Sequence, residues 1–194
     1  MNRIPTVIFG GSFDPVHTGH LALAREVCGR GLAQEVWFMV SPQNPHKTDV
    51  RLTPEDARLR MVQLATAGDS RLVACDFEFS LPRPSYTVHT LEALRSAYPS
   101  REFILLIGAD NWEKFHKWYK WEEILANHRI IVYPRGSEKQ PPLPQGVTWL
   151  FAALHDVSST QVRRAVAAGI DASEMVTPQV WQYIKDNKLY TIEK

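Results

Sequence analysis

The chain has 194 residues, of which 44% are hydrophobic and 22% are charged. A chain of this size and composition can bury one full core, so we expect a single domain over residues 1–194. Its formal net charge of +1 gives no signal of general polyanion binding, and no local basic patch is found, so we expect a small-molecule partner and no nucleic acid. No segment approaches the roughly 20 apolar residues of a membrane span, and no export signal is visible, so no membrane partner is expected.

Cysteine usage indicates a reducing environment. The sequence holds two cysteines, Cys28 and Cys75, which form neither a disulfide framework nor a metal-ligand spacing. We therefore expect a cytoplasmic protein with two small buried thiols and no metal site built from protein ligands.

Apolar runs and helical patterns alternate along the whole chain. Strands are expected, in chain order, at residues 4–9, 35–40, 71–79, 102–107, 129–133 and 147–151. Helices are expected at residues 21–27, from Thr53 as N-cap and Pro54 as first helical residue towards residue 68, at 86–97, at 121–126, from 158 onwards and at 177–184. This alternation predicts an α/β fold, a Rossmann-like doubly wound parallel sheet with helices on both faces and ligands at the carboxyl ends of the strands.

Two segments in the second half of the chain are interpreted as a surface loop and a C-terminal helix. The proline-rich segment 134–146 is interpreted as a mobile surface loop, because another strand follows it. The amphipathic helix at 177–184 is interpreted as structural, but it could instead cover a dimer face. The sequence therefore leaves a homo-oligomer open.

The segment behind the first strand carries the strongest chemical signal. It reads Phe9-Gly10-Gly11-Ser12-Phe13-Asp14-Pro15-Val16-His17-Thr18-Gly19-His20. The paired glycines predict a tight turn with close backbone approach, and His20 is expected to open the next helix. A helix N-terminus attracts anions, and residues three apart share a face, so we expect His17 and His20 side by side at a phosphate. The alternative is that both are ordinary capping or core histidines.

Paired imidazoles point to nucleotidyl transfer. An imidazole can donate to a phosphate oxygen or carry a proton, so two of them can stabilise charge that builds on a phosphoryl group during displacement. The sequence shows no nucleophile elbow and no paired carboxylates for acid–base work, so positioning and charge stabilisation are expected to supply the rate.

A second phosphate site is predicted near the C-terminal end. Hydroxyl residues precede an expected helix, and Arg163 lies one turn further on, where its planar guanidinium suits phosphate oxygens. Ser158 or Ser159 is expected to cap this helix. Taken alone, the pattern favours a plain N-cap and two surface arginines, and only its pairing with His17 and His20 favours a phosphate site.

With these motifs the chain resembles the HxGH nucleotidyltransferase superfamily, and within it the bacterial nicotinate mononucleotide adenylyltransferases. The resemblance covers nearly the whole length. The matching segments are residues 10–15 with 17–20, Pro45-His46-Lys47, Ser85-Tyr86-Thr87, Gly108-Ala109-Asp110, Lys117-Trp118-Tyr119, and Ser158-Ser159-Thr160 with Arg163. The resemblance implies an enzyme of NAD biosynthesis that transfers AMP from ATP to nicotinate mononucleotide, giving deamido-NAD and pyrophosphate with help from Mg²⁺.

The resemblance also implies roles for individual residues. The expected catalytic residues are His17, His20 and Arg163. The expected ATP-binding residues are Gly10, Gly11, Ser12, Phe13, His17, His20, Gly108, Asp110, Ser158, Ser159, Thr160 and Arg163. The expected residues for the acceptor are Ser12, Lys47, Thr87, Trp118 and Tyr119, with Trp118 as a platform for the pyridine ring. The family follows its fifth strand with arginine and a turn, whereas this chain reads Tyr133-Pro134-Arg135-Gly136, so Arg135 is given no contact.

Three alternatives stay open at this level. The tryptophans 112, 118 and 121 could simply pack the core. A sister enzyme could use the same histidines on nicotinamide mononucleotide or phosphopantetheine. A non-catalytic nucleotide-binding module is the third alternative.

Overall fold

Six parallel strands form one sheet in the computed structural model, which describes residues 3–42, 52–134, 140–151 and 157–191. The strands are β1 (Ile4–Gly11), β2 (Glu35–Val40), β3 (Leu72–Cys75), β4 (Arg101–Gly108), β5 (Ile130–Tyr133) and β6 (Val147–Trp149). Their order across the sheet is β3-β2-β1-β4-β5-β6, and every neighbouring pair is parallel. The predicted doubly wound α/β architecture is confirmed.

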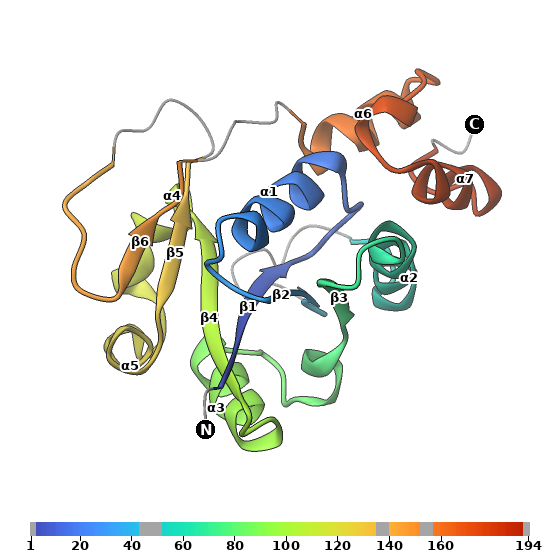
Figure 1. The fold of residues 1–194 in the computed structure, drawn as a ribbon. Helices are drawn as coiled ribbons and strands as arrows, with labels where there is room; N and C mark the ends of the chain where they lie inside the picture. Colours follow the sequence, from blue (N-terminus) through green and yellow to red (C-terminus); the bar gives the residue numbers. More distant parts are fainter. Residues whose placement is uncertain (1–2, 43–51, 135–139, 152–156, 192–194) are drawn as a thin grey trace.

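Helices cover both faces of this sheet (Figure 1). One face packs against α1 (Thr18–Gly29), α2 (Glu55–Thr66), α6 (Ser159–Ala167) and α7 (Pro178–Asp186). The other face packs against α3 (Thr87–Ala97), α4 (Ala109–Trp112) and α5 (Trp121–Asn127). The short 3₁₀ helices are η1 (Phe77–Ser80), η2 (Phe115–Lys117) and η3 (Ser173–Met175). None of the helices described is both long enough and apolar enough to cross a membrane.

The strands are apolar along their whole length because both of their faces are covered. On β1, the buried Val7 and Phe9 belong to the core under α1, whereas the buried Ile8 belongs to the core over α3. Successive side chains on a strand point to opposite faces, so a continuous apolar run fills both cores.

The strand order creates a crevice at one place. The chain winds from β1 towards β3 on one side and from β4 towards β6 on the other, so the direction reverses between β1 and β4. Ligands of open α/β sheets bind outside the carboxyl ends of the strands at such a reversal. Gly11 ends β1 and Gly108 ends β4 at this position.

Two boundaries near the first strand differ from the expectation. Gly10 and Gly11 are the last residues of β1, paired with Met39 and Val40, rather than a turn. Helix α1 begins at Thr18 with His17 as its N-cap. His20 lies inside the first turn because its ring Nδ1 accepts the His17 backbone N–H at 3.2 Å, which caps the helix two residues earlier.

The expected strand at 71–79 is wrong in its second half. Strand β3 ends at Cys75, and the chain then turns through η1, where the Phe79 N–H donates to the Asp76 carbonyl at 2.7 Å. Phe77 and Phe79 alternate with Glu78 as residues of a strand do, but the Glu78 side chain is buried and accepts a hydrogen bond from helix α3. Tertiary contact has overridden the local pattern.

Smaller differences occur at other ends. Pro54 is the N-cap of α2, so neither Thr53 nor Pro54 has its expected place in that helix. Strand β6 stops at Trp149 rather than at residue 151. The C-terminal helix agrees with the expectation, since Thr177 Oγ1 accepts the Val180 N–H at 3.3 Å. In the expected loop at 134–146, residues 140–144 form neither helix nor strand, and Arg135 lies outside the described residues.

Candidate active site

His17 and His20 lie face to face at the start of α1. Their ring centroids are 3.6 Å apart with 30° between the ring planes. Because His20 Nδ1 accepts the backbone N–H of His17, a neutral His20 carries its proton on Nε2. The ring contact confirms the prediction that the two histidines lie side by side.

The side chain of Phe13 packs against the ring of His20. Its own ring is buried and meets the His20 ring edge-on at 5.1 Å, with φ of 47° at its backbone. A Cβ on Gly11 would lie 3.0 Å from the Phe13 ring, so the glycine leaves room for this packing. Any contact of Phe13 with a nucleotide therefore falls to its main chain.

Helix α6 brings the second predicted phosphate site onto the same loop. Ser159 Oγ donates to the Pro15 carbonyl at 2.9 Å, and Arg163 Nη1 donates to the Asp14 carbonyl at 2.6 Å. The other guanidinium end, Nη2, lies 3.3 Å from Thr160 Oγ1. A guanidinium has five N–H donors, so Arg163 keeps donors for a ligand. The two predicted sites, about 140 positions apart in sequence, meet in space.

Ser158 is the residue that caps α6. Its side-chain oxygen accepts the backbone N–H of Gln161 at 3.2 Å, and the Gln161 side chain accepts the Ser158 N–H at 2.6 Å. This reciprocal pair fixes the first turn of α6, whose N-terminus faces the loop that precedes α1.

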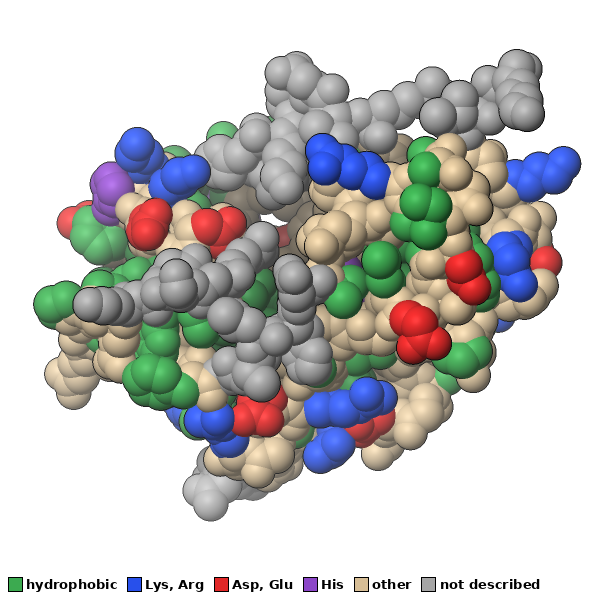
Figure 2. Space-filling model, turned by 90° about the horizontal axis from the view of Figure 1, so that it is seen from above, with side chains coloured by type: hydrophobic (Ala, Val, Ile, Leu, Met, Phe, Trp, Pro, Cys, Tyr) green, Lys and Arg blue, Asp and Glu red, His purple; other side chains and the backbone are tan. Residues whose placement is uncertain are grey.

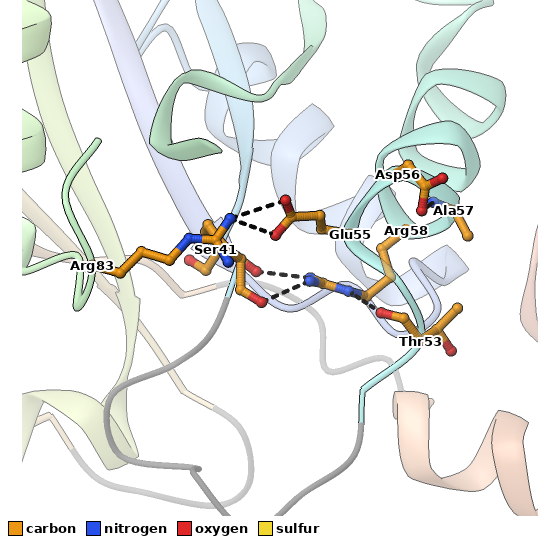
Figure 3. Close-up of polar contacts among 8 residues, drawn as sticks. Ser41, Thr53, Glu55, Asp56, Ala57, Arg58 and Arg83 are labelled. Carbon is orange, nitrogen blue, oxygen red and sulfur yellow. Dashed lines mark hydrogen bonds and ion pairs between the residues drawn. The ribbon is translucent and has the colours of Figure 1, made fainter. Parts of the chain in front are cut away.

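A buried arginine that the sequence analysis did not single out holds this region together. Arg58 on α2 is 1% exposed and donates to four main-chain carbonyls. Figure 3 shows its bonds at Ser41 and Thr53. The acceptors are Ser12, Ser41, Pro42 and Thr53, at distances from 2.7 to 2.9 Å. Burial lowers the pKa of the guanidinium, and Asp14 opposes that shift. Arg58 fixes the loop after β1 against the end of β2.

The sequence does contain a signal for Arg58, because it is a charged residue in an otherwise apolar helical stripe. Arg58, Met61, Val62 and Ala65 are buried on one face of α2 at the spacing i, i+3, i+4 and i+7. A charged side chain in the first place of an apolar helical stripe must find internal partners, because an unpaired buried charge is costly.

Asp14 is the second anchor of the loop that the sequence analysis missed. Its carboxyl is buried, with Oδ1 accepting the Tyr190 hydroxyl at 2.7 Å and Oδ2 accepting the Thr53 N–H at 3.3 Å. Burial and the neighbouring Asp14 charge together raise the pKa of the Tyr190 phenol. The chain's C-terminal segment thus fixes the loop that precedes the histidines.

A cavity of about 370 Å³ opens at the carboxyl ends of β1 and β4. Among the predicted site residues, those that line it are Gly10, Gly11, Ser12, Thr87, Gly108, Trp118 and Tyr119. Strands β4 and β5 run upward in Figure 1, so Figure 2, seen from above, faces this end of the sheet and shows a hollow near the middle of the surface. Acidic and basic side chains are interspersed on the visible part of this face, which shows no extended basic field.

Aromatic side chains form the outer wall of the cavity. Trp118 is half-buried, with its ring 5.4 Å from that of Phe115, and it also faces the cavity. Tyr119 is about half exposed and lies 4.9 Å, ring to ring, from Tyr86. Trp118 therefore combines core packing with a place in the site, whereas Trp112 and Trp121 pack against Phe115.

The N-terminus of α3 opens into the same cavity. Tyr86 is its N-cap and supplies no side-chain hydrogen bond, and the first N–H with a partner inside the helix is that of Thr90, donated to the Tyr86 carbonyl at 3.1 Å. The earlier amides, beginning with Thr87, lie in the first turn, where a helix attracts negative charge. The arrangement suits a carboxylate.

Two predicted residues lie elsewhere. Asp110 is exposed in the first turn of α4 and does not line the cavity. Lys47 lies outside the described residues. The cavity also contains Glu78, which the sequence analysis missed because the alternating Phe-Glu-Phe pattern places it on the polar side of a strand.

Comparison with known proteins gives one consistent answer. The cytidylyltransferase-like family model matches residues 8–165. A relative from Bacteroides thetaiotaomicron, named "Probable nicotinate-nucleotide adenylyltransferase", is 48% identical over 187 residues, covering 95% of this chain and 93% of the relative. A relative of the same name from Flavobacterium johnsoniae is 38% identical, covering 94% and 97%. The nicotinic acid mononucleotide adenylyltransferase of Plasmodium falciparum, solved in complex with NaAD, has a TM-score of 0.77 at 18% identity and covers 97% of this chain and 98% of its own, a likeness of fold.

Proposed function

Because this chain belongs to the nicotinate-nucleotide adenylyltransferase family, within the cytidylyltransferase-like proteins, we propose that it transfers AMP from ATP to nicotinate mononucleotide in NAD biosynthesis. The products are deamido-NAD and pyrophosphate. The observation that carries the proposal is the stacked pair His17 and His20 beside the loop that also receives Arg163.

The chemistry requires no nucleophile from the protein. The attacking group is the acceptor's own phosphate, which is ionised at neutral pH, so no general base has to remove a proton. Its oxygen attacks the α-phosphorus of ATP in line, and the bond from that phosphorus to the pyrophosphate oxygen breaks. Positioning and charge stabilisation then account for the rate.

Charge stabilisation falls to His17, His20 and Arg163. His20 Nε2 and the remaining donors of Arg163 offer hydrogen bonds to phosphate oxygens as negative charge shifts to the leaving group. The end of β1, with Gly10 and Gly11, and the following residues Ser12 and Phe13 carry the nucleotide. Gly108 and Asp110 lie on the ribose side. The start of α6, with Ser158, Ser159 and Thr160, receives the triphosphate.

Mg²⁺ fits this site as an ion carried by ATP. The described residues contain no group of three or more histidine, cysteine or acidic side chains able to hold a metal. Around the histidines they offer hydrogen-bond donors, and Mg²⁺ typically binds through substrate phosphates with only one or two carboxylates. When bound, the ion neutralises charge on the departing pyrophosphate.

The acceptor occupies the cavity between β1, α3 and the Trp118 segment. Trp118 offers a flat face to the pyridine ring, and the first turn of α3 at Thr87 offers amides to its carboxylate, with the main chain of Tyr119 alongside. A helix N-terminus attracts a carboxylate more than a neutral amide, which favours the acid form of the ring. Ser12 and Lys47 are assigned to the acceptor's phosphate.

The test is Mg²⁺-dependent pyrophosphate release from ATP with three acceptors in parallel: nicotinate mononucleotide, nicotinamide mononucleotide and phosphopantetheine. The proposal predicts strong preference for the first. Preference for another acceptor would keep the histidine chemistry and overturn the substrate. ATP binding without pyrophosphate release on any acceptor would identify a nucleotide-binding module instead.

Two cysteines without a disulfide pattern support a cytoplasmic setting for this activity.

A further inference from the structure

A carboxyl group is buried in the wall of the acceptor cavity. Glu78 in η1 is 8% exposed, and among the described residues that line the cavity it is the only acidic one. The proposed reaction gives it no role, since the acceptor phosphate needs no base.

Two hydroxyl groups fix the Glu78 carboxyl in place. Thr90 Oγ1 on α3 donates to Glu78 Oε1 at 2.9 Å, and the Ser41 hydroxyl at the end of β2 also hydrogen-bonds to the Glu78 side chain. Burial holds the pKa of Glu78 above its ordinary value, and the two hydrogen bonds, which favour the ionised form, oppose that rise only in part. A carboxylate has about four lone-pair positions, so acceptor capacity remains after both bonds.

Lys117 is the only basic residue among the described residues that line the cavity, and no ion pair joins it to Glu78. An ionised group that is buried without an opposite charge is costly, and a positively charged ligand would offset that cost. A ligand with a positive charge is therefore a suitable partner for the ionised form of Glu78.

The cavity contains one group that favours negative charge and one that favours positive charge. Thr90 is the fourth residue of α3, so the Glu78 carboxyl is bound to the first turns of the helix whose N-terminus attracts anions. The α3 N-terminus favours negative charge, and the Glu78 carboxyl in its ionised form favours positive charge. Nicotinate mononucleotide has this same polarity, with a carboxylate on a positively charged pyridinium ring.

We propose that Glu78 is a specificity-determining residue whose carboxylate matches the positive charge of the acceptor's pyridinium ring. The inference rests on the proposed function. Trp118, on the same cavity, stacks on the ring, while Ser41 and Thr90 position the carboxylate. The site therefore selects the oxidised, charged ring over its reduced, uncharged form.

The experiment compares two ligands that differ in ring charge. Dissociation constants are measured by calorimetry for nicotinate mononucleotide and for its 1,4-dihydropyridine form. We expect the wild-type protein to bind the charged ring at least about tenfold more tightly, on the scale of close charge pairs across an interface. In Glu78→Gln this ratio falls towards one. Glu92→Gln, an exposed glutamate on α3, is the matched control and keeps the wild-type ratio.

If Glu78 had only a structural role, Glu78→Gln would weaken the binding of both ligands equally and leave the ratio of their dissociation constants unchanged. That result would overturn the proposal. If Glu78→Gln does not fold, the comparison uses Glu78→Asp, which keeps the charge, and Thr90→Val, in which the Glu78 carboxylate has lost one hydrogen bond. The preference for the charged ring must then be larger in Glu78→Asp than in Thr90→Val. A wild-type protein without preference for the charged ring also overturns it. Failure of the proposed function is distinguished by absence of pyrophosphate release with every acceptor, whereas an active protein with an unchanged ratio in Glu78→Gln removes this inference alone.

Discussion

The hydroxyl of Tyr190 donates a hydrogen bond of 2.7 Å to Oδ1 of Asp14, joining residues 176 positions apart. The Asp14 main-chain carbonyl also accepts from Arg163, and its other carboxyl oxygen accepts from Thr53. The loop before His17 is therefore held from three sides by elements far away in sequence.

Tyr190→Phe removes the donor and leaves Asp14 Oδ1 buried without it. We expect a loss of about 1–3 kcal/mol of unfolding free energy, the usual cost of an unsatisfied buried acceptor. Chemical denaturation with urea measures it. Tyr183→Phe, on α7, is the matched control and should unfold near the wild-type midpoint. An unchanged midpoint for Tyr190→Phe would show that the bond contributes nothing.

Arg58→Lys tests the buried guanidinium. Lysine is a single point donor and cannot reach four carbonyls, so several buried acceptors lose their partners. We expect the unfolding free energy to fall by about 3 kcal/mol or more and the KM for ATP to rise, because the Ser12 loop loses its support. Arg60→Lys, exposed on the same helix, is the control. A fully stable Arg58→Lys protein with wild-type KM would contradict the account.

Trp118→Ala tests the ring platform. The KM for nicotinate mononucleotide should rise far more than the KM for ATP, because the side chain faces the acceptor cavity and not the histidines. Steady-state kinetics with each substrate varied in turn separates the two. Trp181→Ala on α7 serves as the control. Equal increases in both KM values would assign Trp118 to general packing.

Asp69→Asn tests an acid-dependent contribution to stability. A hydrogen bond from Arg71 is the main cause that lowers the pKa of Asp69 to about 2. A carboxyl with a lowered folded-state pKa stabilises the fold above its unfolded pKa of about 3.9, and that contribution disappears as the pH falls towards about 2. Because Arg71 and Arg25 are half exposed, we expect no more than about 1 kcal/mol.

The contribution of Asp69 is measured by urea unfolding of the wild type and of Asp69→Asn at pH 6 and at pH 2.5. The difference in unfolding free energy between the two proteins should be smaller at the lower pH. Asp186→Asn, an exposed carboxyl on α7, should show no such narrowing. A gap that is constant with pH would mean that Asp69 acts through packing rather than charge.

Local patterns predicted the sheet but not the supports of the site. The apolar runs of β1, β2 and β4 and the Ser158 cap follow from neighbours in sequence, so they were predictable. The histidine pair followed from the three-residue spacing. Glu78 and Tyr190 depend on contacts with α3 and with Asp14, which no local pattern encodes.

The wrong expectations have the same origin. Phe77 and Phe79 alternate as in a strand, yet the chain turns because the Glu78 carboxyl is bound to Thr90. The first turn of α1 begins earlier than expected because the His20 ring caps it. In both places a polar side chain makes a tertiary or capping contact that outweighs the apolar pattern.

The most direct test of adenylyl transfer is formation of deamido-NAD from ATP and nicotinate mononucleotide by the wild type and by His20→Ala, with the exposed His116→Ala as control. The stacked arrangement of His17 and His20 predicts that His20→Ala loses about 10² or more in kcat, on the scale of a lost charge-stabilising donor, with its fold intact by circular dichroism. His116→Ala should keep wild-type kcat. A folded His20→Ala protein with undiminished kcat would contradict the account.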